Sequence, residues 1–170
     1  LAVTRRFDAA IDVLASARAL RHGARMRFHH GTSELLGRIA IAAAAPPHAD
    51  LADGVPFVEV PPGGRAWVRV RLEAPAVLTR GDRFILRAYS PQVTVAGGVV
   101  LDPLPAKSAI RTVAGRARLA RLDISGVLPF EAAGHDIALA QILDELGGTG
   151  LTAGELTSRL GLAPDLAGDV

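Results

Sequence analysis

Apolar and polar residues alternate along most of the first hundred positions, as they do in β-strands that bury one face. The alternation predicts six strands, at residues 6–14, 24–29, 34–43, 65–73, 83–89 and 94–101. Gly97-Gly98 interrupts the last stretch and predicts a bulge or a sharp bend there. Turn residues separate the strands and no crossover helix lies between them. The pattern therefore favours a small barrel or sandwich over a parallel α/β sheet.

Basic residues recur on the polar faces of three predicted strands, as Arg25 and Arg27, Arg69 and Arg71, and Arg83 and Arg87. If these strands are neighbours, the side chains form a positive surface of the kind that holds phosphate backbones. An ordinary solvated barrel face is the alternative. The aromatic residues expected to be exposed are few, Trp67 and Tyr89, so we expect recognition of backbone and shape more than base reading.

Two prolines in Asp102-Pro103-Leu104-Pro105 end the strand region, because proline cannot continue a sheet ladder. The stretch 107–121 that follows contains basic residues and no acidic ones, and part of it is predicted to be helical. Its basic residues are Lys107, Arg111, Arg116, Arg118 and Arg121. The stretch is interpreted either as a solvated linker or as an arm that follows phosphates. The candidate secondary basic patch comprises Arg25, Arg27, Arg69, Arg71, Lys107, Arg111, Arg116 and Arg118.

The last segment has helical periodicity. Asp136 is expected to cap a helix with Ile137, Ala140 and Leu143 on one face, which ends at Gly147-Gly148. Thr152 and Glu155 form the pattern of a capping box for a second helix, which Gly161 ends, and a third helix is expected to start near residue 162. This order is typical of a helix-turn-helix or the opening of a winged helix, here cut off at residue 170. The expected domains are a barrel at 1–104, a basic linker at 105–134 and a partial winged helix at 135–170.

Composition narrows the classes of protein. The 170 residues contain no cysteine, which excludes disulfides and thiolate metal sites and fits a reducing, cytoplasmic location. No apolar run is long enough to span a bilayer, and no signal peptide is present, so no membrane partner is expected. Because the chain does not begin with methionine, we expect it to be a piece of a longer protein.

The net charge of +2 hides an uneven distribution. Residues 1–121 have a net charge of +9, whereas residues 122–170 have a net charge of −7 with Arg159 as their one basic residue. Two parts of opposite sign suggest two units with different partners.

Few residues carry the pattern of a catalytic or metal site. The chain contains no G-x-x-x-x-G-K-[ST] loop, so nucleotide hydrolysis within these residues is not expected. His29 and His30, near Ser33 and Glu34, could suggest a small hydrolase or a metal site. Adjacent strand residues point to opposite faces, however, so the two histidines are poorly placed to bind one ion. Polar contacts at a loop edge, including contact with phosphate, are the favoured interpretation.

Three strings resemble a known family. The segment 81–91, GDRFILRAYSP, and the segment 94–103, TVAGGVVLDP, resemble the third domain of selenocysteine-specific translation elongation factors, the SelB family. The segment 30–38, HGTSELLGR, resembles the second-to-third strand region of the same domain. The barrel is also similar to the third domain of elongation factor Tu. Residues 136–166 resemble the family's first winged-helix repeat.

The resemblance implies a mainly β fold, a six-stranded antiparallel barrel followed by a truncated winged-helix segment. It also implies a non-catalytic, tRNA-binding part of a factor that delivers selenocysteyl-tRNA to the ribosome at recoded UGA codons. GTP, Mg²⁺ and an mRNA hairpin would be bound by other parts of the parent protein, and no cofactor is expected in this piece. The residues expected near the tRNA backbone are His29, His30, Gly31, Thr32, Ser33, Arg83, Arg87, Thr94, Gly97 and Gly98.

Two further interpretations remain open beside the hydrolase. One is the third domain of another translation GTPase. The other is a DNA-binding regulator that uses the helix-turn-helix, although the acidic character of residues 122–170 disfavours a basic recognition helix.

Overall fold

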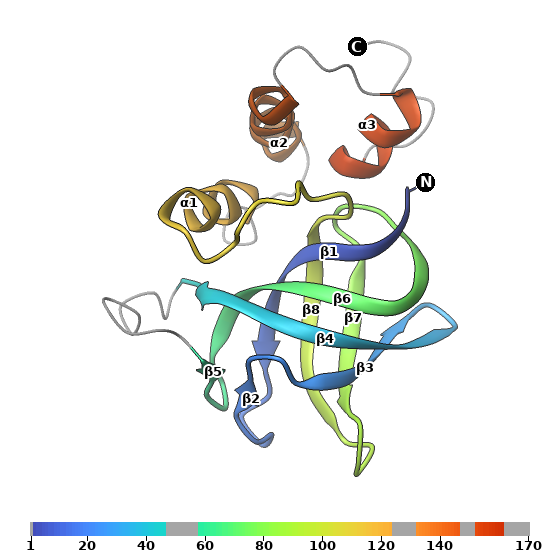
Figure 1. Cartoon of the computed structure of the whole chain (residues 1–170), viewed down its shortest axis with the longest axis vertical. Coiled ribbons are helices and arrows are strands. Elements are labelled where there is room, and N and C mark those ends of the chain that lie inside the picture. The colour runs from blue at the N-terminus through green and yellow to red at the C-terminus, as the bar shows by residue number, and fades with distance from the viewer. Residues whose placement is uncertain (1, 47–57, 124–131, 147–151, 162–170) are drawn as a thin grey trace.

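The computed structural model describes residues 2–46, 58–123, 132–146 and 152–161. Its strands are β1 (Ala2–Val13), β2 (Leu20–Arg21), β3 (Arg25–His30), β4 (Ser33–Ala44), β5 (Glu59–Val60), β6 (Arg65–Leu78), β7 (Arg83–Ala88) and β8 (Thr94–Asp102). Its helices are α1 (Val113–Leu122), α2 (Ala132–Leu146) and α3 (Ala153–Leu160). Figure 1 shows the three helices together on one side of the barrel.

Six strands form a closed antiparallel barrel in the order β1-β6-β4-β3-β7-β8, in which β8 also pairs with β1. The six predicted strands are therefore confirmed, and of the two predicted architectures the chain forms the barrel and not the sandwich. The short strands β2 and β5 pair separately with each other. Sequence patterning missed them, because two residues are too few to display a period.

The barrel interior is filled by the apolar faces that the alternation predicts. At its centre Phe28 packs against Phe7 and Phe84, with ring centroids 5.2 Å and 5.1 Å away, and the Phe7 and Phe84 rings are 5.5 Å apart. All three side chains are buried. Tilted and edge-on aromatic pairs of this kind contribute beyond the apolar area that they bury.

The glycine pair of β8 does not make a bulge, so that part of the expectation was wrong, whereas the sharp bend stays a prediction. The pairing of β8 with its neighbours shifts register elsewhere, between Asp8 and Ala9 and between Leu86 and Arg87. A Cβ atom at Gly98 would lie 2.5 Å from Cζ of Phe84 and 2.8 Å from the carbonyl oxygen of Ala10. The position is glycine because the aromatic cluster and the β1 backbone leave no room for a side chain.

Replacing Gly98 with alanine is expected to destabilise the fold by about 1–3 kcal/mol, since the added methyl group must displace a packed ring or backbone. Gly97→Ala is the matched control, because the nearest atom to a Cβ there is 4.0 Å away. Urea unfolding of both variants measures the difference. Equal stability of the two variants would contradict the packing explanation.

The outer face of β6 is not exposed along its whole length, in contrast to the sequence prediction. Trp67 is 7% exposed and Arg69 is 4% exposed. Trp67 packs among small residues of β1 and β4 and apolar residues of the helices, and its indole Nε1 donates to Asp123 Oδ2 at 2.7 Å. The alternation correctly separated two strand faces, but the helices bury part of the outer one. Tyr89, the other aromatic residue expected outside, is 48% exposed.

The helices confirm part of the predicted pattern. Thr152 caps α3 in a capping box with Glu155, and Gly161 ends the helix in the left-handed conformation with φ 73°. The stretch 107–121 is helical from Val113, where α1 begins after its N-cap Thr112. Gly147-Gly148 and the expected third helix after residue 162 lie outside the described residues. The assignment of this segment to a winged helix stays a prediction.

Two expectations for α2 were wrong. The helix begins at Ala132, so Asp136 lies within it and does not cap it. Leu143, expected on the packed face, is 54% exposed, whereas Ile142 is buried and Glu145 and Gln141 face α1. The apolar pattern selected the wrong face because the buried face of α2 carries polar side chains that bind arginines. No helix within the described residues is long and apolar enough to cross a membrane.

Candidate nucleic-acid interface

The residues expected near RNA lie on one continuous part of the barrel wall. The hairpin between β3 and β4 turns at Gly31, whose φ of 54° favours glycine. Strand β3 pairs with β7, which pairs with β8, so the register places Arg87 between Arg27 and Thr94. Segments that are far apart in the sequence are thus brought side by side.

The hairpin is tied to the start of β7 by a polar contact. His30 Nε2 lies 3.3 Å from Asp82 Oδ2, and Asp82 in turn accepts a hydrogen bond from the Thr79 backbone at 2.8 Å. The contact places the exposed Thr32 and Ser33 next to the turn that precedes Arg83. The hairpin and the β7 arginines therefore form one surface.

Arg83 is the most available cation on this surface. Its side chain is exposed, and within the described residues its guanidinium makes no hydrogen bond or ion pair. Arg87 is half-buried and donates from Nη2 to the Gln92 carbonyl oxygen at 2.5 Å. Ile85 between them is 47% exposed, and Thr94 is exposed on the neighbouring strand. This surface combines charged hydrogen-bond donors with an exposed hydroxyl group and an exposed apolar side chain. Such a combination suits a phosphate backbone better than a small apolar ligand.

The glycines of β8 differ in their relation to this surface. The Cβ position of Gly98 points to the Phe84 ring, so packing accounts for that residue. Gly97 has open space at its Cβ position and lies opposite Ile85 on β7. Both glycines are half-buried, but only at Gly97 does the Cβ position face open space.

The two histidines do not form a metal site. His29 Nε2 lies 3.5 Å from Glu34 Oε2, whereas His30 approaches Asp82 and stacks on Phe28 with ring centroids 6.2 Å apart. The histidines thus contact different carboxylates on different sides of the strand. In the part of the chain that the structure describes, no group of three or more His, Cys, Asp or Glu side chains could hold a metal ion.

Arg25 and Arg27 are on the outer face but are already paired. Arg25 donates to both oxygens of Glu73, at 2.7 Å and 2.8 Å, and this contact holds the pKa of Glu73 below its usual value. Arg27 binds Glu34. Both guanidinium groups also lie over the Tyr89 ring, 4.9 Å and 5.4 Å from its centroid. Their charge is largely neutralised, so they contribute less to a positive surface than the sequence suggests.

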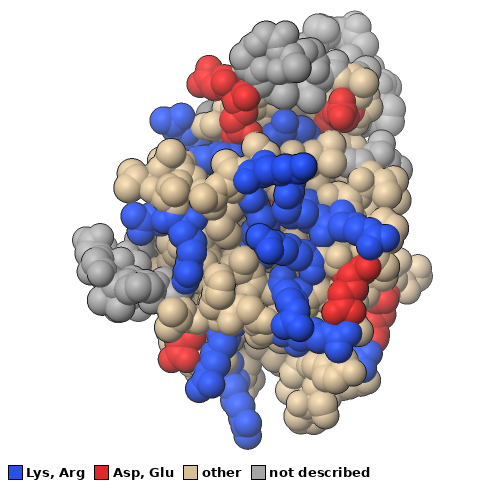
Figure 2. Space-filling view, in the orientation of Figure 1, with Lys and Arg blue, Asp and Glu red and all other residues tan. Residues whose placement is uncertain are grey.

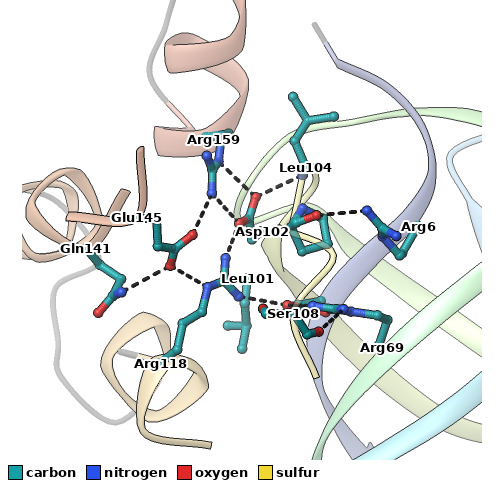
Figure 3. Close-up of polar contacts among 12 residues, drawn as sticks. Arg6, Arg69, Leu101, Asp102, Leu104, Ser108, Arg118, Gln141, Glu145 and Arg159 are labelled. Atoms are coloured by element: carbon teal, nitrogen blue, oxygen red, sulfur yellow. Dashed lines mark hydrogen bonds and ion pairs between the residues drawn. The ribbon is translucent and has the colours of Figure 1, made fainter. Parts of the chain in front are cut away.

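The prediction that Arg69 and Arg118 are accessible in a secondary basic patch was wrong. Both belong to a buried ion-pair cluster that joins β1, β6 and β8 to all three helices (Figure 3). The members of this cluster are Asp8, Arg69, Asp102, Arg118, Glu145 and Arg159. Asp8 binds Arg69 at 2.7 Å and 3.0 Å and Arg118 at 2.8 Å. The helices cover these arginines, and strand alternation carries no signal of that.

A buried arginine outside the cluster fastens the same junction. Arg80 donates to the carbonyl oxygens of Leu101 at 2.5 Å and Leu122 at 2.7 Å, and so joins the end of β8 to the end of α1. Burial lowers the pKa of Arg80 to about 10, so the group is still charged at neutral pH. The helices are therefore held to the barrel by buried cations as well as by apolar packing.

The other members of the predicted secondary patch remain accessible. Arg71, Lys107 and Arg111 line an open pocket of about 480 Å³ on the far side of the barrel from β7, and Arg116 is half-buried on α1. Two further arginines that sequence analysis did not select, Arg6 and Arg38, line the same pocket. They appear as isolated strand residues in the sequence, and only the register between strands brings them together.

Two comparisons with known proteins agree with this architecture. The family model described as "Selenocysteine-specific elongation factor, beta-barrel domain" matches residues 7–107. A selenocysteine-specific elongation factor from Desulfomicrobium baculatum is 32% identical over 143 residues, which cover 84% of this chain. The match spans 19% of that relative's length.

Proposed function

We propose that this chain, which belongs to the family of selenocysteine-specific elongation factors, holds the backbone of selenocysteyl-tRNA for delivery to the ribosome at recoded UGA codons. The observation that carries the proposal is the exposed Arg83 guanidinium, which lies on the same strand face as Arg87, between the 29–33 hairpin and β8 with Thr94. The chain spans about a fifth of the relative that it matches. Binding of GTP with Mg²⁺, and contact with the ribosome and an mRNA hairpin, are accordingly proposed for the longer protein.

Charge and shape both support contact with the RNA backbone. Arg83 offers a planar group that can donate two hydrogen bonds to one phosphate, and Arg87 adds a second positive charge although its Nη2 already binds Gln92. The exposed hydroxyl groups of Thr32, Ser33 and Thr94 can donate to neighbouring phosphate or ribose oxygens. Tyr89 is the one aromatic residue of this surface within the described residues, and it stacks on Arg25 and Arg27. We therefore expect binding to depend on backbone and shape.

The test is charge reversal at both arginines. The double variant Arg83→Glu/Arg87→Glu is expected to bind a selenocysteine tRNA transcript at least about tenfold more weakly than the parent chain. It is also expected to lower the slope of log K against log salt by about two, about one for each lost phosphate contact. Fluorescence anisotropy at several salt concentrations measures both quantities.

Arg18→Glu/Arg21→Glu is the matched control, because it changes the net charge equally and lies in and before β2, outside the barrel wall. The control is expected to retain the affinity within about twofold at moderate salt, where charges beyond the Debye length of ~10 Å are screened. Equal losses in the two double variants would point to a general charge effect and count against this surface.

The structure disfavours DNA recognition by the helical segment. Arg159, the one basic residue after position 121, is 5% exposed and bound within the ion-pair cluster. A recognition helix needs basic side chains that are free to reach phosphates and bases. A third domain of another translation GTPase would bind tRNA by the same surface, but the family match covers the selenocysteine-specific type.

A further inference from the structure

A row of four arginines crosses the outer wall of the barrel in direct register. Arg6 of β1 pairs with Arg71 of β6, Arg71 with Arg38 of β4, and Arg38 with Arg25 of β3. Like charges directly opposite each other on neighbouring strands destabilise a sheet. Arg25 is paired with Glu73, which also interacts electrostatically with Arg38, but none of the other three forms an ion pair with a carboxylate within the described residues. We call Arg6, Arg71 and Arg38 the arginine row.

The arginine row lies beneath an open pocket without any negative charge. The pocket holds about 480 Å³, and no Asp or Glu is among the residues that line it. The segment 107–111 forms its other wall and adds the exposed Lys107. His22 Nδ1 accepts a hydrogen bond from the Ile41 backbone at 3.0 Å, so in the neutral ring Nε2 carries the proton and can donate. Figure 2 shows Lys and Arg side chains gathered over the middle of this face.

The guanidinium groups of the arginine row retain unused donors. Arg71 is exposed and makes no hydrogen bond or ion pair among the described residues. Arg38 makes a single contact, from Nη1 to the Gly23 carbonyl oxygen at 3.3 Å. Arg6 donates from Nη2 to Pro105 at 3.1 Å, but its Nε is shielded from solvent without a partner. Three adjacent cations in direct register repel one another, and an anionic ligand in the pocket would relieve that repulsion.

We propose that the arginine row and Lys107 form a second binding site for the phosphate backbone of RNA, separate from the surface around Arg83. In the closed barrel β6 is three strands away from β7 in either direction, so the two sites face opposite sides. Strands are about 4.8 Å apart, so the arginine row extends over ~10 Å. That length matches successive phosphates of a strand better than one isolated anion. The barrel can thus hold two RNA segments at once.

The test compares two neutralising double variants of the whole chain. The probe is a labelled RNA duplex of twelve base pairs, and anisotropy titrations measure its affinity and stoichiometry. The parent chain is expected to bind two duplexes, and Arg38→Gln/Arg71→Gln and Arg83→Gln/Arg87→Gln are each expected to bind one. For the row variant we expect a loss of at least about tenfold at the affected site and a salt slope lower by about two.

Thermal unfolding shows whether the row variant is still folded. Because it removes like charges that face each other, its melting temperature is expected to be unchanged or raised. Loss of RNA binding together with a lower melting temperature would overturn the proposal, since a damaged fold would account for it. An unchanged duplex stoichiometry in this variant would overturn it as well.

Two further outcomes separate the possible ligands and surfaces. Inorganic phosphate is added as a competitor to the labelled duplex. If it displaces the duplex from this site as well as unlabelled duplex does at the same phosphate concentration, the site binds free anions and the RNA proposal is wrong. If the Arg83/Arg87 variant keeps both duplexes while the row variant loses one, the second site stands and the tRNA surface proposed above fails.

Discussion

Asp102→Ala is expected to destabilise the folded chain by about 3–5 kcal/mol, the cost of removing one partner from a buried ion pair. Asp102 is 1% exposed and accepts hydrogen bonds from Arg118, from Arg159 at 2.7 Å and 3.2 Å, and from the Leu104 backbone at 2.9 Å. Without this carboxylate, two buried guanidinium groups keep their desolvation cost and lose the more buried of the two carboxylates that they share, Glu145 being the other.

Asp12→Ala is the control for this prediction. Asp12 also pairs with an arginine, Arg65 at 2.7 Å, but its side chain is 64% exposed. Exposed pairs contribute about 0–1 kcal/mol, so the control is expected to unfold at nearly the same urea concentration as the parent chain. Similar midpoints for the two variants would show that the cluster does not stabilise the fold as its burial implies.

The same experiment tests how the helices are attached. The cluster joins β8 to α1 and α3 through Arg118 and Arg159, so the helices should detach before the barrel unfolds if Asp102 is lost. Limited proteolysis of Asp102→Ala is expected to cut first beyond residue 104. The proposed domains are a barrel at 1–104, a linker at 105–134 and a helical unit at 135–170. All three contribute residues to the buried ion-pair cluster, so we expect their stabilities to be coupled.

Phe28→Ala is expected to cost about 3–5 kcal/mol, the usual range for truncating a buried phenylalanine. Phe28 is 1% exposed and lies between Phe7 and Phe84, so the closed barrel cannot collapse into the space that the ring leaves. The loss would combine the transfer free energy of the ring with the cost of a cavity.

Ile85→Ala is the matched control, because Ile85 pairs with His29 on the adjacent strand but is 47% exposed on the outer face. The control is expected to change the free energy of unfolding by less than about 1 kcal/mol. Urea denaturation, fitted with one m-value for both variants, measures the two changes in the free energy of unfolding. A small loss in Phe28→Ala would mean that the aromatic cluster repacks, against the rigid barrel described here.

Most of the barrel could be predicted from the sequence, because a strand that buries one face records this locally in a period of two residues. The inward positions of β6 and β7 follow that rule, including Val68, Val70, Phe84 and Leu86. Helix caps are equally local, as the box of Thr152 and Glu155 demonstrates. The segments that begin at Gly81 and Thr94 also indicated the family, and the family model confirms it over residues 7–107.

The candidate sites depend on tertiary structure to a greater degree. Alternation distinguishes the two faces of a strand but does not show what covers the outer one, so Trp67 and Arg69 appear exposed in the sequence. Asp8 and Arg118, 110 residues apart, meet only because α1 packs on the barrel. α2 likewise buries a polar face, which no apolar period can reveal.

The sequence by itself determined the six barrel strands, the caps of α3 and the family, because each depends on residues within a few positions of one another. The tertiary structure decided which arginines are free. It buries Arg69, Arg118 and Arg159 against carboxylates, and strand register lines up Arg6, Arg71 and Arg38, which form no ion pair with any described residue. Folding leaves the net charge of the chain unchanged but determines which of its charged groups are exposed. The availability of each charge depends on distances between segments that are remote in sequence, since burial and ion pairing act through space.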